Sequence, residues 1–499
     1  MEAFFLEDFS LRWYYSNIFF LGVENMYTAV ISALNNFLYQ PYIVPLFLVA
    51  AGLFFTIGTK GIQFRLLKET FRVVGEKPKE EGAISSFMAL MVSTASRVGT
   101  GNIIGVSTAL CIGGAGAIFW LWVTAILGGA SAFVESALAQ IYKRRDDDGS
   151  CYGGPSYYME TALKAKWLGV IFAVIIILTY AVGYNMLASY NLQSCFAGFS
   201  FYKEGVTSVI IGIILAVLFA AIVLGGAKRL ANVTAVLVPV MGIIYILVSL
   251  IILVINAGNL GSMFASIFAS AFDFKAISGG FFGSCVMWGI KRGLYSNEAG
   301  MGSAPNAAAT ADVSHPAKQG LVQMLSVFID SLLICTATAF MCLSSGIAPT
   351  SEMSGAPYVQ QTMQASLGSF GPIFIAVALS LFAFTTLIGN YYYCEGCLRF
   401  IIGKKPGKTL LLVFRVIAAI LVGVGAVLSA GIVWDTADAL QGLMVVINIP
   451  VIIILSKKAF ACLEDYVAQK KAGKEPEYVA ADCGIKEELD YWQGNAKQA

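Results

Sequence analysis

Apolar stretches separated by short polar segments make up most of the chain. Most are about 20 residues long, the length that an α-helix needs to cross a bilayer. They predict an all-α integral membrane protein with about eleven transmembrane helices. Residues 17–39, in front of the first span, mix aromatic and polar side chains and predict an interfacial helix. The expected spans are residues 41–58, 85–112, 117–142, 167–189, 205–224, 234–255, 278–310, 321–343, 370–393, 410–430 and 439–455.

Two of these spans are interrupted by glycine and polar residues. The first interruption reads STASRVGTGNIIGVSTA over 93–109, and the second reads GIKRGLYSNEAGMGSAPNAA over 289–308. Glycine costs about 1 kcal/mol relative to alanine inside a helix, and a backbone group freed at membrane depth must find a partner in protein or in a polar ligand. Broken helices in corresponding halves of a membrane protein indicate the central binding site of a transporter.

Positive charge alternates between loops and predicts the orientation of the chain. Only Arg12, Lys203 and Lys275 lie in the loops of the opposite side. Because lysine and arginine favour the cytoplasmic side, the N-terminus is expected outside and the C-terminus inside, which requires an odd number of spans. The basic residues expected inside are Lys60, Arg65, Lys68, Arg72, Lys77, Lys79, Lys143, Arg144, Arg145, Lys228, Arg229, Lys318, Lys404, Lys405, Lys408, Lys457 and Lys458.

The two interrupted spans then enter the membrane from opposite sides, which is typical of an inverted repeat. Residues 1–82 are expected to hold the interfacial helix, one extra span and a cytoplasmic loop. Residues 83–257 and 258–457 would form two five-helix repeats, and 458–499 a cytoplasmic tail, solvated from Glu464 onward.

Composition excludes an ordinary soluble domain, because 58% of the residues are hydrophobic and 12% are charged, against roughly 25% charged in soluble proteins. No basic run is dense enough to suggest nucleic acid. His315 is the only histidine and is expected to be a simple loop residue. Zinc-protease motifs and histidine-based triads are therefore excluded, and we expect no enzyme activity.

The GTGN stretch can expose the amides of Thr100 and Gly101 beside the positive end of a half-helix, where a carboxylate binds well. The alternative is that these glycines only allow close helix packing. Farther along, Thr385 and Thr386 precede Asn390 by about one turn, and their hydroxyls would suit Na⁺. The alternative there is a hydroxyl that bonds back to its own helix.

Charged residues at membrane depth are costly and are either paired or functional. They could form a structural ion-pair network that fixes the broken helices, or they could couple and gate transport. Asp330, near the middle of its span, is the best candidate for coupling. The three cations are Arg97, Lys291 and Arg292, and the three matching acids are Glu135, Glu298 and Asp330.

Five motifs make the chain similar to the alanine or glycine:cation symporter family. They are GTGN (99–102), YGGPSYY (152–158), GIKRGLYSNEAGMGSAP (289–305), HPAKQGLVQMLSVFIDSLLICTATA (315–339) and FTTLIGNYYYCE (384–395). The resemblance implies the leucine-transporter fold, with five plus five inverted helices after one extra helix. It implies Na⁺-coupled, or sometimes H⁺-coupled, uptake of a small neutral amino acid, with Na⁺ as the coupling ion and no other cofactor.

The resemblance also implies roles for individual residues. The amides of Thr100 and Gly101 would hold the substrate carboxylate, and Thr386 would also touch the substrate. The amino-group side or a nearby ion site would be shaped by Asn102, Ser296 and Asn297. Sodium would be bound by the carbonyls of Ala95, Val98 and Phe382 and by the hydroxyls of Thr385 and Thr386. Coupling or gating candidates are Arg97, Lys291, Arg292, Glu298 and Asp330.

One residue departs from the family pattern. Alanine-transporting relatives typically have tryptophan where this chain has Asn390. A carboxamide enlarges the site and adds a donor and an acceptor, which suggests glutamine or asparagine as substrates in addition to alanine or glycine.

The expected partners are the amino acid, Na⁺ or H⁺ and the lipid bilayer, with no nucleic acid and no protein partner. The resemblance implies a bacterial inner membrane. A passive channel lined by the same polar break, or an amino-acid sensor, remains as an alternative.

Overall fold

In a computed structural model, the chain is described over residues 25–273 and 284–492, except residues 41, 79, 81 and 148. It is mostly helical, with one short hairpin in which β1 (Arg144–Arg145) pairs antiparallel with β2 (Cys151–Tyr152). The helices are α2 (Ile43–Gly58), α3 (Ile62–Arg65), α4 (Leu67–Val74), α5 (Ser86–Arg97), α6 (Val106–Gly113), α7 (Gly116–Ile141), α8 (Pro155–Leu163), α9 (Lys166–Ile177), α10 (Asn185–Ser194), α11 (Val206–Val223), α12 (Gly226–Ile255), α13 (Leu260–Ala271), α15 (Cys285–Asn297), α16 (Pro305–Ala308), α17 (Pro316–Val327), α18 (Thr336–Ser344), α19 (Ala356–Leu367), α20 (Phe370–Ile402), α21 (Lys408–Gly425) and α22 (Ala430–Lys471). Short 3₁₀ turns are η3 (Ala257–Asn259), η6 (Ser351–Met353) and η7 (Ala480–Cys483).

Three π-helical turns interrupt this regular pattern: η1 (Gly101–Gly105), η2 (Leu178–Tyr184) and η5 (Phe328–Cys335). Such turns inside α-helices are frequent at functional sites. η1 belongs to the first predicted break, and η5 contains Asp330.

Nine helices of the described chain are long and apolar enough to cross a membrane. The two interrupted segments, α5 to α6 and α15 to α16, are not among the nine because their pieces are short. A multi-pass helical protein is thus confirmed, whereas the number of about eleven spans and the inverted repeat stay predictions. Residues 17–24 of the expected interfacial helix and 278–283 of the second interrupted span lie outside the described residues.

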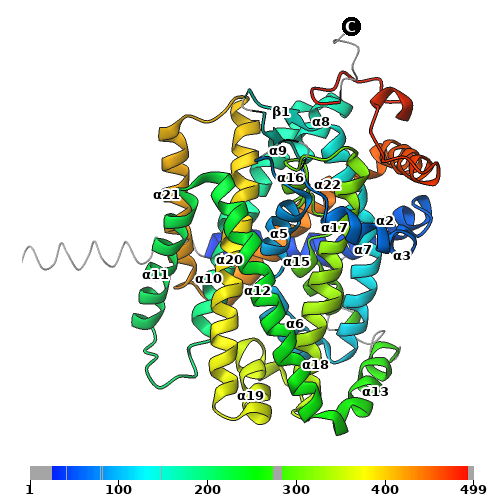
Figure 1. Cartoon of the computed structure of the whole chain (residues 1–499). Coiled ribbons are helices and arrows are strands. Elements are labelled where there is room, and N and C mark those ends of the chain that lie inside the picture. The colour runs from blue at the N-terminus through cyan, green and yellow to red at the C-terminus, as the bar shows by residue number, and fades with distance from the viewer. Residues whose placement is uncertain are drawn as a thin grey trace, which may run out of the picture.

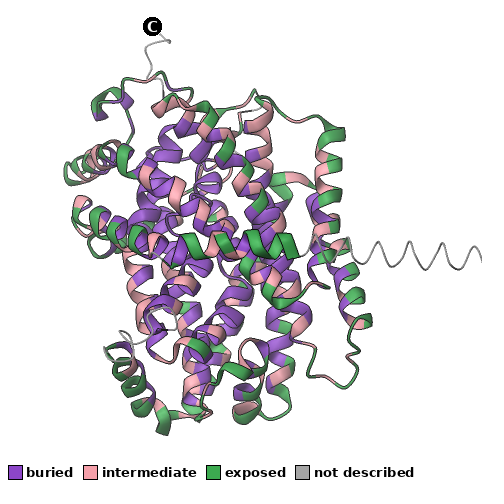
Figure 2. Ribbon diagram, turned by 180° about the vertical axis from the view of Figure 1, so that it is seen from behind, coloured by how far each residue is buried: buried purple, intermediate pink, exposed green. Residues whose placement is uncertain are grey.

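The helices form one bundle, with α13 and α19 at one end and β1, α8 and the C-terminal segment at the other (Figure 1). Buried positions fill the middle, and exposed positions lie on the outer helices (Figure 2). α11, α12 and α21 expose many valine, isoleucine and leucine side chains. Such outward apolar surfaces suit contact with lipid tails.

α7 lies inside the bundle against α15 and α17 because its middle consists of small residues. A Cβ atom on Gly128 would lie 2.8 Å from the Cβ of Ala299, and one on Gly129 would lie 2.9 Å from the ring of Phe328. Small residues allow helices to approach closely in membranes, so α7 supports both the second break and η5.

The C-terminal segment differs from its expected solvated state. α22 continues to Lys471, well past the expected end at residue 455. After it, Tyr478, Leu489 and Trp492 are buried against the body of the protein. A charged composition predicts exposure, but the apolar residues interspersed in this segment find a surface on which to pack.

Candidate functional site

The first break opens between α5 and η1. The side-chain oxygen of Asn102 accepts a hydrogen bond from the amide of Gly99 at 2.7 Å. Because η1 begins at Gly101, the amides of Thr100 and Gly101 lie in its first turn, where backbone N–H groups have no partner within the helix. The break therefore places backbone donors in the buried centre of the bundle.

α20 presents a threonine to this break. A Cβ atom added to Gly99 would lie 1.9 Å from Oγ1 of Thr386, so glycine leaves room for that hydroxyl. The Thr386 hydroxyl is buried and has no hydrogen-bond partner within the described residues. The Thr385 hydroxyl instead donates to the carbonyls of Leu381 and Phe382 at 3.1 and 3.0 Å. The unused oxygen of Thr386 is thus available to a ligand.

A second glycine brings the backbones of α20 and α5 together. A Cβ atom on Gly389 would lie 2.5 Å from the amide nitrogen of Ser96 and 3.0 Å from the carbonyl carbon of Ala95. Ala95 and Val98 are at the C-terminal end of α5, where carbonyl groups lack downstream partners in the same helix. These carbonyls therefore lie at the end of α5 that borders the break.

Ser96 links the two broken segments to α20. Its Oγ lies 2.8 Å from Oε1 of Glu298 and 2.6 Å from Oδ1 of Asn390. The Nδ2 of Asn390 donates to Oδ1 of Asn185 in α10 at 2.9 Å. The sequence pattern does not single out Ser96 or Asn185, and its only signal for Asn185 is a polar residue inside an apolar span.

The second break is built around two carboxylates. Glu298 has a left-handed backbone with φ of 56°, and its carboxylate accepts a hydrogen bond from Ser303 at 2.8 Å. Glu135 of α7 accepts the amide of Gly302 and the Nδ2 of Asn448, both at 3.0 Å. Glu135 thus satisfies a backbone donor that the break leaves free, and Glu298 binds a hydroxyl of the same segment.

Asp330 joins the first break to the second. It accepts hydrogen bonds from Asn102 at 2.7 Å, from Ser296 at 2.8 Å and from Ser331 at 2.8 Å. Asn297 donates to the Ser331 hydroxyl at 3.2 Å. Asn102, Ser296, Asn297 and Asp330 are thereby brought into one cluster.

Two of the three cations at the breaks, Lys291 and Arg292, share one carboxylate that the sequence does not single out. Lys291 and Arg292 both contact Asp438 of α22, at 2.8 and 3.0 Å, and Arg97 donates to the backbone carbonyl of Gln323 at 3.2 Å. The sequence matched these cations to Glu135, Glu298 and Asp330 in number only, and the acid that pairs with Lys291 and Arg292 is Asp438. Asp438 lies more than a hundred residues away along the chain, so equal numbers of charges could not identify it.

An aromatic ring lies over the first break. A Cβ atom on Gly101 would lie 2.8 Å from the ring of Tyr295. Centroid distances from that ring are 4.8 Å to Tyr184 and 5.2 Å to Trp434, and the guanidinium of Arg292 lies 4.2 Å from the Trp434 ring centroid. Trp434 and Tyr295 therefore connect the ion pairs of Asp438 to the first break.

Sequence comparison decides what kind of protein holds this arrangement. A sequence model described as the sodium:alanine symporter family matches residues 24–480. The chain belongs to this family. Membership supports Na⁺-coupled amino-acid symport and a multi-pass membrane protein.

Proteins similar to this family member are also named as carriers or symporters. The amino-acid carrier protein AlsT of Bacillus subtilis is 42% identical, covering 96% of this chain and all of the relative. The probable sodium/glutamine symporter GlnT of Bacillus subtilis is 42% identical over 90% of this chain and 92% of the relative. The sodium/alanine symporter AgcS of Methanococcus maripaludis is 37% identical over 86% and 95%. Because they are carriers and symporters, the expectation of no enzyme activity is confirmed.

A solved structure shares the fold of this symporter-family chain. A mutant form of the manganese transporter of Eremococcus coleocola aligns with a TM-score of 0.50 at 14% identity, over 82% of this chain and 86% of that one. At this identity the likeness concerns the fold alone.

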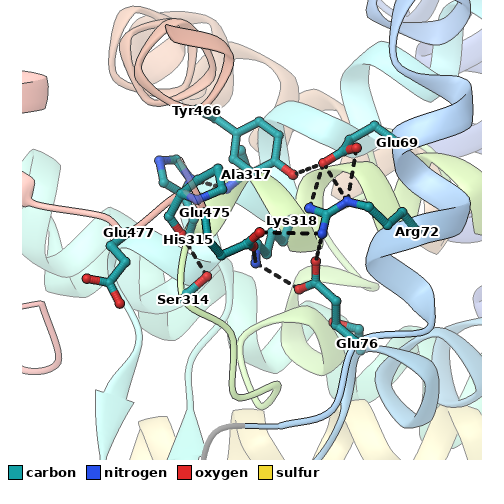
Figure 3. Close-up of polar contacts among 12 residues, drawn as sticks. Glu69, Arg72, Glu76, Ser314, His315, Ala317, Lys318, Tyr466, Glu475 and Glu477 are labelled. Carbon is teal, nitrogen blue, oxygen red and sulfur yellow. Dashed lines mark hydrogen bonds and ion pairs between the residues drawn. The ribbon is translucent and has the colours of Figure 1, made fainter. Parts of the chain in front are cut away.

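Away from the breaks, the end of the bundle that carries the C-terminal segment holds a network of charges (Figure 3). Lys318 of α17 is buried between Glu76 at 2.8 Å and Glu475 at 2.6 Å. Arg72 of α4 contacts Glu69 at 2.7 Å and both other acids. Burial acts to raise the pKa of Glu69, but hydrogen bonds from Arg72 and Tyr466 outweigh it and lower the pKa to about 2. α4, α17 and the C-terminal segment of this symporter-family protein are thus tied together.

His315, next to this network, is more than a loop residue, so that expectation is wrong. Its Nδ1 accepts the amide of Ala317 at 3.2 Å and caps α17, and its Nε2 lies 3.0 Å from Asp465 of α22. The side chain is fully buried. Burial lowers the pKa of His315 to about 4, although Asp465 acts in the opposite direction.

Proposed function

We propose that this protein is a secondary active transporter that couples Na⁺ entry to uptake of a small neutral amino acid by alternating access. The observation that carries the proposal is the meeting of a broken helix, at Gly99, with the buried hydroxyl of Thr386, which has no partner in the described part of the chain. Backbone groups freed in this way bind substrate and ion in transporters with discontinuous helices.

The substrate would lie at the first break. The amides of Thr100 and Gly101 would bind its carboxylate, because N–H groups at a helix start attract anions. The cluster of Asn102, Ser296 and Asp330 is next to this position, and a carboxylate there would attract the amino group.

Sodium would lie between α5 and α20. Its oxygen ligands would be the carbonyls of Ala95, Val98 and Phe382 with the hydroxyls of Thr385 and Thr386. The close contact at Gly389 supports this placement because it brings the two backbones together. Thr385 would have to give up a hydrogen bond to Leu381 or Phe382 in order to take part.

Coupling would work through the shared break. Sodium would order the end of α5, which holds the substrate amides on its other side. Because coupling between two sites is reciprocal, Na⁺ and the amino acid would each raise the affinity of the other by the same factor. Asp330 is the proposed coupling residue, since it contacts both broken segments.

Alternating access would be gated on the two sides of the break. Arg97, Glu298 and the pair of Lys291 and Arg292 are the gating candidates, and rocking of the broken helices would remake their contacts. We further propose a bacterial inner membrane, with the N-terminus outside and the C-terminus in the cytoplasm, from the distribution of basic loops.

Alanine or glycine are the substrates that the family suggests, and glutamine or asparagine are those that Asn390 suggests. The name of the relative GlnT, a probable sodium/glutamine symporter, supports the second pair.

Uptake of labelled alanine, glycine, glutamine and asparagine into proteoliposomes tests the function. We expect concentrative uptake with an inward Na⁺ gradient only. Concentrative uptake with an inward H⁺ gradient alone would establish an H⁺ symporter and overturn the sodium site. Equilibrating flux that ignores both gradients would establish a channel, and binding without flux would establish a sensor.

A further inference from the structure

Asn185 and Asn390 form a pair of side-chain amides beside the proposed amino-acid site. The Nδ2 of Asn390 donates to Oδ1 of Asn185 at 2.9 Å, and its Oδ1 accepts from Ser96 at 2.6 Å. Both asparagine side chains are fully buried. Asn390 thus uses both of its polar groups, whereas the Nδ2 of Asn185 has no partner within the described residues.

A buried amide nitrogen carries two N–H donors, and leaving them unpaired in the protein interior is unfavourable. Buried polar groups are almost always hydrogen-bonded, so an exception needs an explanation. Asn185 lies directly after the π-helical turn η2, in the kind of irregular helix that often accompanies a functional site. Its free donors call for an acceptor supplied by a ligand.

The position of the pair gives the size of that ligand. Thr386 contacts the break at Gly99, and Asn390 contacts Ser96 on the same face of α20, one turn further on. The two contacts are separated by about one helical turn, roughly 5.4 Å. An amino acid held at the break would reach the asparagine pair with a side chain of that length, which a glutamine has and an alanine lacks.

We propose that Asn185 is a specificity-determining residue that, together with Asn390, binds the terminal carboxamide of glutamine. The Nδ2 of Asn185 donates to the carboxamide oxygen of the substrate, and the substrate NH₂ donates to the second lone pair on Oδ1 of Asn390. This inference rests on the proposed function, because it takes the amino acid to lie at the Gly99 break.

The same geometry disfavours two isosteres. Methionine would leave the donors of Asn185 unpaired, and a site built to hydrogen-bond its substrate rejects an analogue that lacks the polar group. Glutamate would place a carboxylate against the Asn390 oxygen and near Glu298, which contacts Ser96. A carboxamide is the group that satisfies both asparagines.

The matched variants Asn185→Leu and Asn191→Leu test the proposal by uptake in proteoliposomes. Asn191 is an equally buried asparagine of α10 whose Nδ2, unlike that of Asn185, has an acceptor, Thr100 Oγ1 at 3.0 Å. We expect Asn185→Leu to lower kcat/KM for glutamine at least about tenfold more than for alanine, as for loss of a buried hydrogen bond. Asn191→Leu should lower both alike, because Thr100 belongs to the carboxylate end that all substrates share. Equal effects of Asn185→Leu on both substrates, or no effect, would overturn the proposal.

A measurement on the unmodified protein keeps the test valid if Asn185→Leu fails to fold. Unlabelled glutamine, methionine and glutamate compete against Na⁺-driven uptake of labelled alanine. Glutamine should inhibit at a concentration at least about tenfold lower than the other two. Equal inhibition by methionine, or alanine uptake that glutamine does not inhibit, overturns this inference alone. Absence of Na⁺-driven uptake of every amino acid overturns the proposed function as well.

Discussion

At the scale of single residues, the hydrogen bonds that a side chain lacks are as informative as those it makes. Asp330 accepts hydrogen bonds from three donors, and Glu135 and Glu298 satisfy donors of the second break. Thr386 and Asn185 are both buried, yet each retains a polar atom without a hydrogen-bond partner among the described residues. The bonded carboxylates help to hold the breaks in place, and an unused buried hydroxyl or amide is free to take up a ligand.

Replacing Thr386 by valine tests this distinction, because valine keeps the shape and removes the hydroxyl. The variant loses one oxygen ligand of Na⁺, and if that loss is comparable to losing a polar interaction with a charged group, about 1.5–3 kcal/mol, the Na⁺ concentration for half-maximal uptake should rise at least about tenfold. The measurement is the rate of uptake against Na⁺ concentration in proteoliposomes. Thr386→Ser, which restores the hydroxyl, should recover most of the affinity, and an unchanged Na⁺ dependence in Thr386→Val would contradict the proposed site.

At the scale of helices, contacts between backbones determine where side chains meet. Gly389 lets α20 touch α5 at Ser96, and the small residues of α7 admit Ala299 and Phe328. The polar groups of the site lie on these elements, so the close approach of the helices sets their distances.

Gly389→Ala should therefore disturb both stability and uptake. The added Cβ would lie 2.5 Å from a backbone nitrogen that cannot rotate away, and such overpacking costs about 1–3 kcal/mol. Gly396→Ala in the same helix is the control, because apart from the adjoining backbone of that helix no described atom lies within 4 Å of its Cβ position. That change should be neutral or should stabilise by up to about 1 kcal/mol. Thermal unfolding in detergent and alanine uptake measure both effects, and equal behaviour of the two variants would refute the packing argument.

At the scale of the whole molecule, the C-terminal segment packs against one end of the bundle. It contributes Glu475 to the ion pairs around Lys318, and the amide of Tyr478 donates to the carbonyl of Ser314 at 3.0 Å. The indole of Trp492 donates to the carbonyl of Gln140 at the end of α7. Through it, α7, α17 and α22 are held together at that end.

Truncation after Gly473 should lower the melting temperature, because it exposes the surface that Tyr478, Leu489 and Trp492 cover. Each large apolar side chain contributes about 1.5–3 kcal/mol when buried. A chain ending at Trp492 is the control, since it keeps every contact named above. Identical melting temperatures for the two truncations, measured in detergent, would show that the segment does not contribute to stability.

His315 should make the folding stability of the protein sensitive to acid. Its pKa is about 4 in the folded protein, below the ordinary value of about 6.5. Between these values the unfolded chain binds a proton at this residue that the folded chain does not. The contribution of neutral His315 to the free energy of unfolding is therefore fully present above pH 6.5 and is lost as the pH is lowered toward 4. The loss should approach about 3 kcal/mol, measured by unfolding across this range.

His315→Gln removes the titrating group while keeping a polar side chain, and it should flatten the dependence between pH 6.5 and 4. An unchanged slope in this variant would assign the acid sensitivity to other groups.

The sequence by itself determined the features that act within one segment of chain. Apolar length predicts a membrane helix, and glycine-rich stretches predict breaks. In the structure α5 ends at Arg97, just before Gly99, and α15 ends at Asn297, just before Gly300, although it continues through Gly289 and Gly293. The family motifs lie within single segments too, and the family that they indicate is confirmed.

Only the tertiary structure decided which segments meet. Asp438 as the partner of Lys291 and Arg292, Asn185 beside Asn390, and the burial of His315 all depend on contacts between residues far apart in the chain. The physical reason is that helix formation and membrane insertion depend on local composition, whereas a hydrogen bond or an ion pair depends on how whole helices pack.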